Sequence, residues 1–314
     1  MKHLVTGMAG FIGSHLAARL AERGDEVVGI DSFLEAYPRE VKEGRLRWLS
    51  QFERVHFVEG DLFSADIEAL LSGVDVVFHQ AAQAGVRASW GDRFEVYTRN
   101  NILVTQRLLE ACKGNPLQRF VYASSSSVYG DHAPIPTAET APTRPYSPYG
   151  VTKLAGEHLA MLYQANYGVP SVALRYFTVF GPRPRPDMAF CKFARAILSG
   201  EPIRVYGDGE QSRGFTHVND VVEANLAATV EPVVGEVFNI GGAVQLTVNQ
   251  VIERFETVIG KTAVVIREAR QEGDVSHTMA DTTKARMQLR WEPRAPFMDC
   301  LADHVQSVKE FYGL

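Results

Sequence analysis

Short apolar runs alternate with amphipathic stretches through the first half of the chain. The runs predicted to be strands are His3–Thr6, Glu26–Ile30, Val55–Val58, Val74–His79, Arg119–Ser124 and Ser171–Tyr176. The stretches predicted to be helices are Ile12–Arg23, Ile67–Leu71, Phe94–Cys112 and Tyr149–Tyr167. Strand–helix alternation predicts βαβ units and a parallel sheet. The strand candidates are nearly continuous apolar runs, which indicates a sheet covered by helices on both faces.

The pattern changes after about residue 180, where prolines cluster and the elements become shorter. We expect helices at Met188–Leu198, Asp220–Thr229, Val248–Ile259 and Pro296–Phe311, and strands at Ile203–Tyr206, Val237–Ile240 and Ala263–Ile266. No flexible linker separates the two parts. The sequence therefore predicts a second, smaller α/β lobe that packs directly on the first.

Composition excludes several classes of protein. The chain has 314 residues, of which 46% are hydrophobic and 22% charged, with a net charge of −5. These values are typical of a globular protein and exclude a disordered or fibrous chain. No apolar run reaches the roughly 18 residues of a membrane helix. The slightly acidic balance gives no indication of a nucleic-acid partner.

The N-terminus and the cysteines both indicate a reducing compartment. The chain enters a strand-like run at once, so we expect no secretion signal. Its three cysteines, Cys112, Cys191 and Cys300, are far apart and do not suggest a disulfide framework or a zinc site. We expect a cytoplasmic protein without a structural metal.

A glycine-rich turn joins the first strand to the first helix. Gly7, Gly10 and Gly13 form a GxxGxxG pattern, which permits a tight turn and a close approach of backbone to a pyrophosphate at the helix N-terminus. Asp31 ends the second strand, where its carboxylate can accept hydrogen bonds from ribose hydroxyls and repel the extra phosphate of NADP. NAD is therefore favoured. Asp61 either meets the adenine amine or caps a helix.

This turn predicts the fold class. We expect an α/β protein with a Rossmann-type doubly wound parallel sheet. The NAD-binding domain would span residues 1–180. Residues 181–314 would form the smaller C-terminal α/β substrate-binding lobe, with some chain crossing back to the first domain.

Two further motifs carry candidate chemistry. Tyr149 and Lys153 are four residues apart, so on a helix they share one face. A lysine ammonium beside a phenol favours the phenolate, which can remove a proton from an alcohol. A serine run, Ser124–Ser127, ends a predicted parallel strand and places hydroxyls where such sheets bind ligands.

Together these motifs resemble the extended short-chain dehydrogenase/reductase family, specifically its NAD-dependent nucleotide-sugar epimerases and dehydratases. The resemblance also includes Val77–Ala82, Leu174–Phe177 and Arg213–Val218, and covers essentially the whole chain. It implies that Tyr149 is the base and acid, that Lys153 lowers its pKa and holds the nicotinamide ribose, and that Ser125 bonds the reacting oxygen. It implies NAD contacts by Gly7, Gly10, Phe11, Ile12, Gly13, Asp31, Ser32, Asp61, Leu62, Gln80, Ala81, Ala82, Asn100, Tyr149, Lys153 and Tyr176.

The residues after Ser125 distinguish reactions within this family. Dehydratases usually carry Asp-Glu there and related decarboxylases a Glu before the Val-Tyr, whereas this chain has Ser126 and Ser127. The absence of a carboxylate favours a 4-epimerase. Thr178, where epimerases of neutral hexoses usually have Asn, and the stretch Arg185–Ala189 resemble the UDP-glucuronate 4-epimerases.

Charge supports an anionic UDP-sugar as the substrate. Residues 175–213 carry seven basic and four acidic side chains in a protein of net charge −5. Hydroxyls of the serine run and Thr178 can cradle a C6 carboxylate, with Arg185 or Arg87 adding charge. The expected substrate contacts are Arg87, Ser125, Ser126, Ser127, Thr178, Arg185, Ala189, Val205, Tyr206, Arg213, Arg270 and Asp274. Arg213 matches a phosphate contact of the family; Arg270 and Asp274 are expected at the diphosphate and its ribose, and Tyr206 borders the uracil or belongs to the core.

Three other functions remain open. A UDP-galactose or UDP-N-acetylhexosamine 4-epimerase is the nearest, followed by a UDP-glucuronate decarboxylase. A non-catalytic NAD sensor on the same fold is the third, because fold alone does not determine function. The resemblance also implies a homodimer formed by the helices Phe94–Cys112 and Tyr149–Tyr167, with Leu154, Leu159 and Leu162 as candidate contacts.

Overall fold

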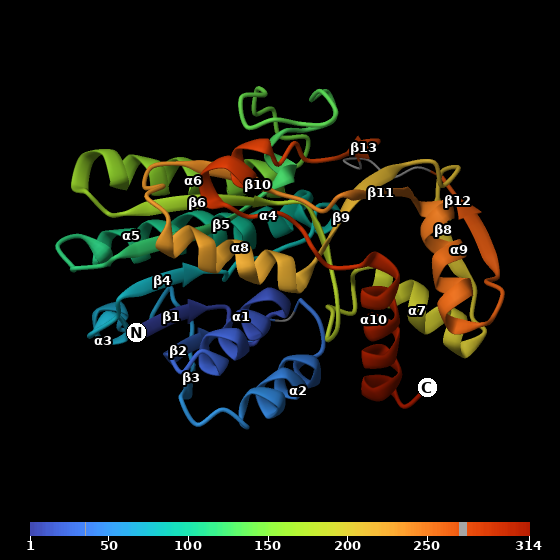
Figure 1. Ribbon diagram of the computed structural model, residues 1–314, viewed down its shortest axis with the longest axis horizontal. Coiled ribbons are helices and arrows are strands. Elements are labelled where there is room, and N and C mark those ends of the chain that lie inside the picture. The colour runs from blue at the N-terminus through green and yellow to red at the C-terminus, as the bar shows by residue number, and fades with distance from the viewer. Residues whose placement is uncertain (35, 270–274) are drawn as a thin grey trace.

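A seven-stranded parallel sheet forms the centre of the larger lobe (Figure 1). This computed structural model describes residues 1–34, 36–269 and 275–314. The strand order is β10-β6-β5-β4-β1-β2-β3, and every neighbouring pair is parallel. The strands are β1 (Lys2–Thr6), β2 (Glu26–Asp31), β3 (Val55–Glu59), β4 (Val76–His79), β5 (Arg119–Ser125), β6 (Ser171–Tyr176) and β10 (Val237–Ile240). The order reverses between β1 and β4, which is the position where doubly wound sheets open a ligand-binding crevice. The predicted fold class is confirmed.

Helices cover both faces of this sheet. On one face lie α1 (Phe11–Glu22) and α8 (Val218–Val230), which share a buried cluster with Val5, Val76 and Phe78. On the other lie α3 (Ile67–Leu71), α5 (Val104–Cys112) and α6 (Pro148–Tyr167), clustered with Leu4 and Val77. Alternate residues of one strand thus enter different cores, which explains why the strands are apolar throughout.

The smaller lobe has its own buried cluster. Its helices are α7 (Ala189–Ser199), α9 (Val248–Ile259) and α10 (Phe297–Tyr312). Its strands form two small sheets: β7 (Thr178–Phe180), β9 (Ser212–His217), β11 (Val244–Thr247) and β13 (His277–Thr278) in one, β8 (Ile203–Tyr206) and β12 (Val265–Glu268) in the other. Between these elements β10 and α8 return to the large sheet. The domain boundary at residue 180 therefore stays a proposal.

Several predicted elements were wrong or missing. The stretch predicted as one helix, Phe94–Cys112, is divided into α4 (Phe94–Tyr97), a π-helical segment (Thr98–Leu103) and α5. The strand predicted at Ala263–Ile266 begins two residues later, as β12. The helix α2 (Arg39–Leu49) was not predicted, because two of its buried side chains, Lys42 and Arg45, are charged and leave no apolar stripe. The short strands β7, β9, β11 and β13 were also missed.

None of the helices in the described ranges is both long and apolar enough to span a membrane. The three cysteines are free thiols and all are buried.

Candidate active site

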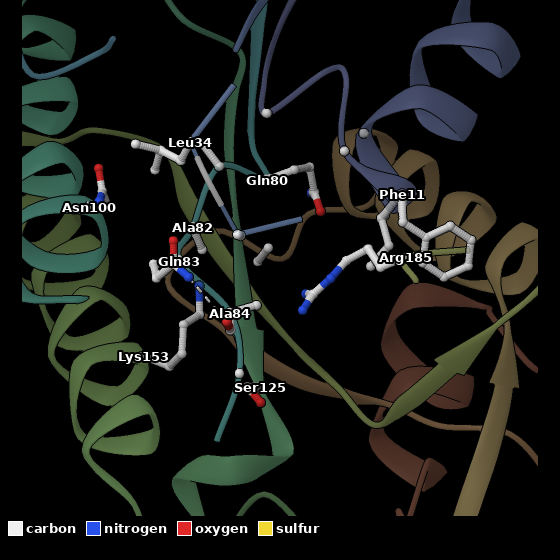
Figure 2. Close-up of a pocket in the computed structure, with 18 of the residues that line it drawn as sticks. Phe11, Leu34, Gln80, Ala82, Gln83, Ala84, Asn100, Ser125, Lys153 and Arg185 are labelled. Atoms are coloured by element: carbon white, nitrogen blue, oxygen red, sulfur yellow. Dashed lines mark hydrogen bonds between the residues drawn. The ribbon is translucent and has the colours of Figure 1, made fainter. Parts of the chain in front are cut away.

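One cavity opens at the carboxyl ends of the strands of the large sheet, where the strand order reverses (Figure 2). It is lined by the glycine-rich turn, the ends of β2, β4, β5 and β6, the start of α6, and residues of the segment 176–188 that leads into the smaller lobe. All sixteen residues expected to contact NAD lie in this lining. The same lining includes the candidate substrate residues Ser125, Ser126, Ser127, Thr178 and Arg185.

The glycine-rich turn leaves no room for side chains. Gly7 has φ +70, and a Cβ there would lie 2.8 Å from the backbone of Ala81 on the neighbouring strand end. A Cβ on Gly13 would lie 2.3 Å from the carbonyl oxygen of Gly7. The turn therefore brings backbone directly to the cavity wall at the start of α1, whose N–H groups and dipole suit a phosphate. These features fit the pyrophosphate of NAD.

Two carboxylates of the cavity are each paired with a cation. Asp31 accepts a bond from Lys42 Nζ at 2.7 Å and another from the backbone N–H of Phe33. Lys42 belongs to the unpredicted helix α2, is largely buried and lines the cavity. Asp61 pairs with Arg99 at 2.7 Å. Asp31 thus lies in the cavity, as expected for a ribose-binding carboxylate. The ammonium group of Lys42 beside it was not predicted from the sequence.

The three candidate catalytic residues come from adjacent elements. Ser125 ends β5, while Tyr149 and Lys153 lie one turn apart on α6. Ser147 caps this helix by accepting a bond from Gly150 N at 3.1 Å, and Pro148 occupies its first turn. Figure 2 shows Lys153 and Ser125 facing the cavity from neighbouring walls.

Burial controls the protonation of this group. It raises the pKa of Tyr149, although the hydrogen bond with Ser125 and the charge of Arg185 act to lower it. Burial also lowers the pKa of Lys153 to about 7, opposed by the charge of Glu157. Burial of the phenol thus opposes the expected lowering of the Tyr149 pKa by Lys153, because a buried phenolate is costly; the role of Lys153 stays a prediction. The ammonium of Lys153 lies 4.5 Å from the centre of the Tyr122 ring.

A buried ion pair connects the elements behind these residues. Glu157, one turn beyond Lys153, binds Arg175 of β6 through two hydrogen bonds of 3.0 and 2.6 Å. Its carboxylate also accepts a bond of 2.6 Å from Ser124, the neighbour of Ser125. Arg175 extends the network to Tyr129 at 2.6 Å. One carboxylate thus connects β5, β6 and α6.

The substrate side of the cavity carries hydroxyls and an arginine. Thr178 begins β7, and Ser126 and Ser127 follow β5 in a short turn stabilised by a bond from Ser127 N to Ser125 Oγ. Arg185 reaches into the cavity from the side opposite Lys153 (Figure 2) and forms an ion pair with Asp187.

The other predicted substrate residues lie elsewhere. Of the described residues, Arg87, Ala189, Val205, Tyr206 and Arg213 are not in the cavity lining. The guanidinium of Arg87 lies 4.3 Å from the centre of the Tyr206 ring, so these two form a second group beyond the cavity. Arg213 donates to backbone carbonyls of Ser212, Val275 and Ser276. Arg270 and Asp274 lie outside the described residues.

Sequence reasoning missed several lining residues. Besides Lys42, these include Leu34, Tyr37, Gln83, Ala84, Gly85, Val86 and Met188. Recognition of the helix at 39–49 would have placed Lys42 eleven residues after Asp31, within reach of the same ribose site. Ala84, Gly85, Val86 and Met188 lie in or beside stretches that resemble the UDP-glucuronate 4-epimerases, but they were not among the expected contacts. Leu34, Tyr37 and Gln83 lie in loops whose course is set by tertiary contacts.

The Asp31–Lys42 pair generates a prediction about cofactor choice. Replacing Asp31 with Ser should weaken NAD binding about tenfold or more, since a hydrogen bond to a charged group contributes about 1.5–3 kcal/mol. It should improve NADP relative to NAD, because Lys42 becomes free to bind the 2′-phosphate. Calorimetric titration of cofactor-stripped protein with both nucleotides measures this. Lys42→Met should instead weaken NADP binding relative to NAD. Equal weakening of both nucleotides by Asp31→Ser would contradict the assignment.

The lowered pKa of Lys153 predicts that the folding stability of the protein rises with pH. Its ordinary value is 10.5, so between about pH 7 and pH 10 the unfolded chain binds more protons than the folded chain, and stability rises with pH. Lys153→Met removes this cost. In cofactor-stripped protein, the Lys153→Met variant should melt at a higher temperature than the wild type. This difference should be largest at or below pH 7 and decline toward pH 10. A gain that is constant or grows with pH would refute the burial argument. Lys192→Met, at an exposed position of α7, is the matched control.

Comparisons with known proteins agree with this geometry. The model of the NAD dependent epimerase/dehydratase family matches residues 3–241. YtcB of Bacillus subtilis, described as an uncharacterized UDP-glucose epimerase, is 43% identical over 99% of both chains. The UDP-glucuronate 4-epimerase of Thermodesulfobacterium geofontis is 37% identical over 98% of this chain and 96% of its own.

A solved structure is similar over the whole chain. It is the UDP-glucuronic acid 4-epimerase of Bacillus cereus in complex with UDP-glucuronic acid and NAD, at 43% identity and a TM-score of 0.96. The match covers 99% of this chain and 100% of that one. The protein therefore belongs to the NAD-dependent epimerase/dehydratase family.

Proposed function

We propose that this protein is a UDP-glucuronate 4-epimerase that interconverts UDP-glucuronate and UDP-galacturonate. The observation that carries the proposal is the composition of the cavity. Ser125, Tyr149 and Lys153 share it with Ser126, Ser127, Thr178 and Arg185. If the C4 hydroxyl of a sugar binds Tyr149, other parts of the same sugar contact the hydroxyls of Ser126, Ser127 and Thr178 and the guanidinium of Arg185. These groups are suited to bind a carboxylate at C6. The activity of the Bacillus cereus and Thermodesulfobacterium proteins supports the same choice.

The chain's residues divide the work of the reaction. Bound NAD supplies a nicotinamide that reversibly accepts the hydrogen of C4 as hydride. Tyr149 takes the proton of the 4-hydroxyl and later returns it, while Ser125 donates a hydrogen bond to the same oxygen. Lys153, brought toward a neutral state by burial, regains its charge beside a ribose hydroxyl and a developing phenolate. Epimerisation requires the 4-keto sugar to rotate about its link to the diphosphate.

The 4-keto form of a uronic acid is a β-keto acid, which loses CO2 when the bond to C6 aligns with the ketone π system. An epimerase must therefore hold the carboxylate out of that alignment. We assign this role to the hydroxyls of Ser126, Ser127 and Thr178, with Arg185 adding positive charge. Hydrogen bonds from several fixed donors hold the carboxylate in one position relative to the ring, and so keep the C5–C6 bond out of alignment with the ketone, better than one ion pair would.

The remaining substrate residues stay predictions. Ala189, Val205, Tyr206 and Arg213 belong to the smaller lobe, and Arg87 contacts Tyr206 from the loop after β4. A UDP group extending from the cavity would lie on this side. Arg270 and Asp274 lie outside the described residues, so their expected contacts with the diphosphate and its ribose stay predictions. The cytoplasmic location and the absence of a nucleic-acid partner also stay predictions.

Proton NMR of the purified protein with UDP-glucuronate and no added NAD tests the proposal. We expect a new anomeric signal from UDP-galacturonate, which would also establish that the cofactor is retained. UDP-glucose and UDP-N-acetylglucosamine serve as substrates without the carboxylate. Conversion of one of these in preference, or formation of a UDP-pentose with release of CO2, would replace the proposal by one of the alternatives.

The carboxylate contacts predict the behaviour of two variants. Ser127→Ala and Thr178→Ala should each raise KM for UDP-glucuronate about tenfold or more, since a hydrogen bond to a charged group contributes about 1.5–3 kcal/mol. Each should also increase the fraction of UDP-pentose, because the C5–C6 bond can then reach alignment with the ketone π system. Product analysis by chromatography measures both effects. Unchanged affinity together with no pentose would eliminate this role.

We also propose a homodimer formed by α5 and α6. Leu162, Leu103 and Val151 are exposed by 54%, 49% and 48% along these helices and the adjoining π-helical segment. Leu154 and Leu159, the other expected contacts, pack against this chain's own buried clusters instead. Light scattering should give twice the chain mass, and Leu162→Arg should give the single mass. A wild-type monomer at micromolar concentration would overturn this proposal.

A further inference from the structure

Arg45 is a buried arginine whose hydrogen bonds reach two distant parts of the site. Its side chain is 1% exposed and lies on α2, outside the cavity lining. It donates to the carbonyl oxygens of Ala9 at 3.1 Å, Arg183 at 3.1 Å and Pro184 at 2.8 Å. A fourth bond, of 3.0 Å, goes to the hydroxyl of Tyr37.

All four of these acceptors are neutral. A buried cation with neutral hydrogen-bond acceptors and one ring contact, to Tyr37 at 5.6 Å, is costly, which points to a role beyond packing. The neighbouring charges add to that cost. Arg183 lies with its guanidinium 4.0 Å from the Trp48 ring, and the charges of Arg183 and Arg45 both help to lower the pKa of the buried His15. The Arg45 side chain thus joins Ala9 of the glycine-rich turn directly to Arg183 and Pro184.

One end of this connection is the cofactor turn. Ala9 lies between Gly7 and Gly10, in the backbone that fits the pyrophosphate. Tyr37 lies in the cavity lining, with its ring centre 5.9 Å from the guanidinium of Arg185. A change in the turn on cofactor binding would therefore be felt at the Arg45 guanidinium, whose planar fork tolerates little displacement.

The other end is the segment that carries Arg185. Gly181 and Arg183 both have positive φ, of +148 and +53, which for Arg183 is a strained conformation that only its surroundings can maintain. Arg45 holds the carbonyl side of this segment. From α10, His304 bonds the Gly181 carbonyl at 2.7 Å, and Ser307 accepts from Arg183 N at 2.7 Å. Arg185, the next residue but one, then points into the cavity (Figure 2).

We propose that Arg45 is a positioning residue that couples occupation of the glycine-rich turn by NAD to the placement of Arg185 for an anionic sugar. This inference rests on the proposed function, because it assigns Arg185 to the uronate carboxylate. Coupling of this kind is reciprocal: NAD tightens binding of UDP-glucuronate, and UDP-glucuronate tightens binding of NAD by the same factor. A neutral sugar, which makes no use of Arg185, shows a smaller effect.

The test measures binding to the full-length chain carrying Tyr149→Phe, so that the substrate is not converted. Calorimetry gives the affinity of UDP-glucuronate and of UDP-glucose for protein stripped of nucleotide and for protein refilled with NAD. We expect NAD to tighten UDP-glucuronate binding about fivefold or more, within the usual range of coupling between sites. Adding Arg45→Lys, which keeps the charge but loses the fork, should reduce that factor toward one and leave the UDP-glucose values unchanged. Arg47→Lys, at an exposed position of the same helix, should keep the full factor.

Each outcome decides a separate question. Full coupling in a folded Arg45→Lys protein, or no coupling without that substitution, overturns the inference. If no protein prefers UDP-glucuronate to UDP-glucose, the proposed function fails instead. Should Arg45→Lys not fold, Ser307→Ala loosens the same segment from α10 with a small change. If Ser307→Ala reduces the factor by which NAD tightens UDP-glucuronate binding and leaves that for UDP-glucose unchanged, the coupling is supported. An unchanged factor for UDP-glucuronate refutes it.

Discussion

The buried carboxylate of Glu157 is the interaction on which the active site depends most. It binds Arg175 on β6 and Ser124 on β5 while its own helix, α6, carries the two catalytic side chains. Ser124 and Arg175 are also direct partners in the register of the two strands. Because all three groups are buried, loss of any one would leave a charge or hydroxyl without its partner, at a cost of about 3–5 kcal/mol for the ion pair. The network thus holds the helix that carries Tyr149 against the strand that ends at Ser125.

The substrate side is constructed differently. Thr178 and Arg185 lie on the segment that leaves β6 for the smaller lobe, so their placement depends on what holds that segment. Bonds from α2 and α10 hold this segment at both sides. The site thus combines a rigid chemical centre on the sheet with a substrate contact that neighbouring helices position. Such a division suits a reaction in which the sugar must turn over within the cavity while C4 returns to one tyrosine.

Much of this arrangement was predictable from the sequence, for identifiable reasons. The glycine spacing, the ends of the apolar strands and the Tyr149/Lys153 pair are local patterns, and parallel-sheet topology brings them to one edge. What could not be predicted depends on tertiary contacts between charged residues. Lys42 and Arg45 look like surface residues of a polar helix, yet both are buried by partners elsewhere in the chain. The pKa of Tyr149 also moves opposite to the simple charge argument, since the sequence does not show how deeply the phenol is buried.

The central claim is that one tyrosine and a retained cofactor invert C4 of a UDP-uronate through a ketone. The most direct test uses UDP-glucuronate deuterated at C4, with the product examined by proton NMR. We predict UDP-galacturonate in which the deuterium remains at C4, because a hydrogen that leaves and returns as hydride does not exchange with water. Loss of the deuterium to water, or inversion at any other carbon, would contradict it.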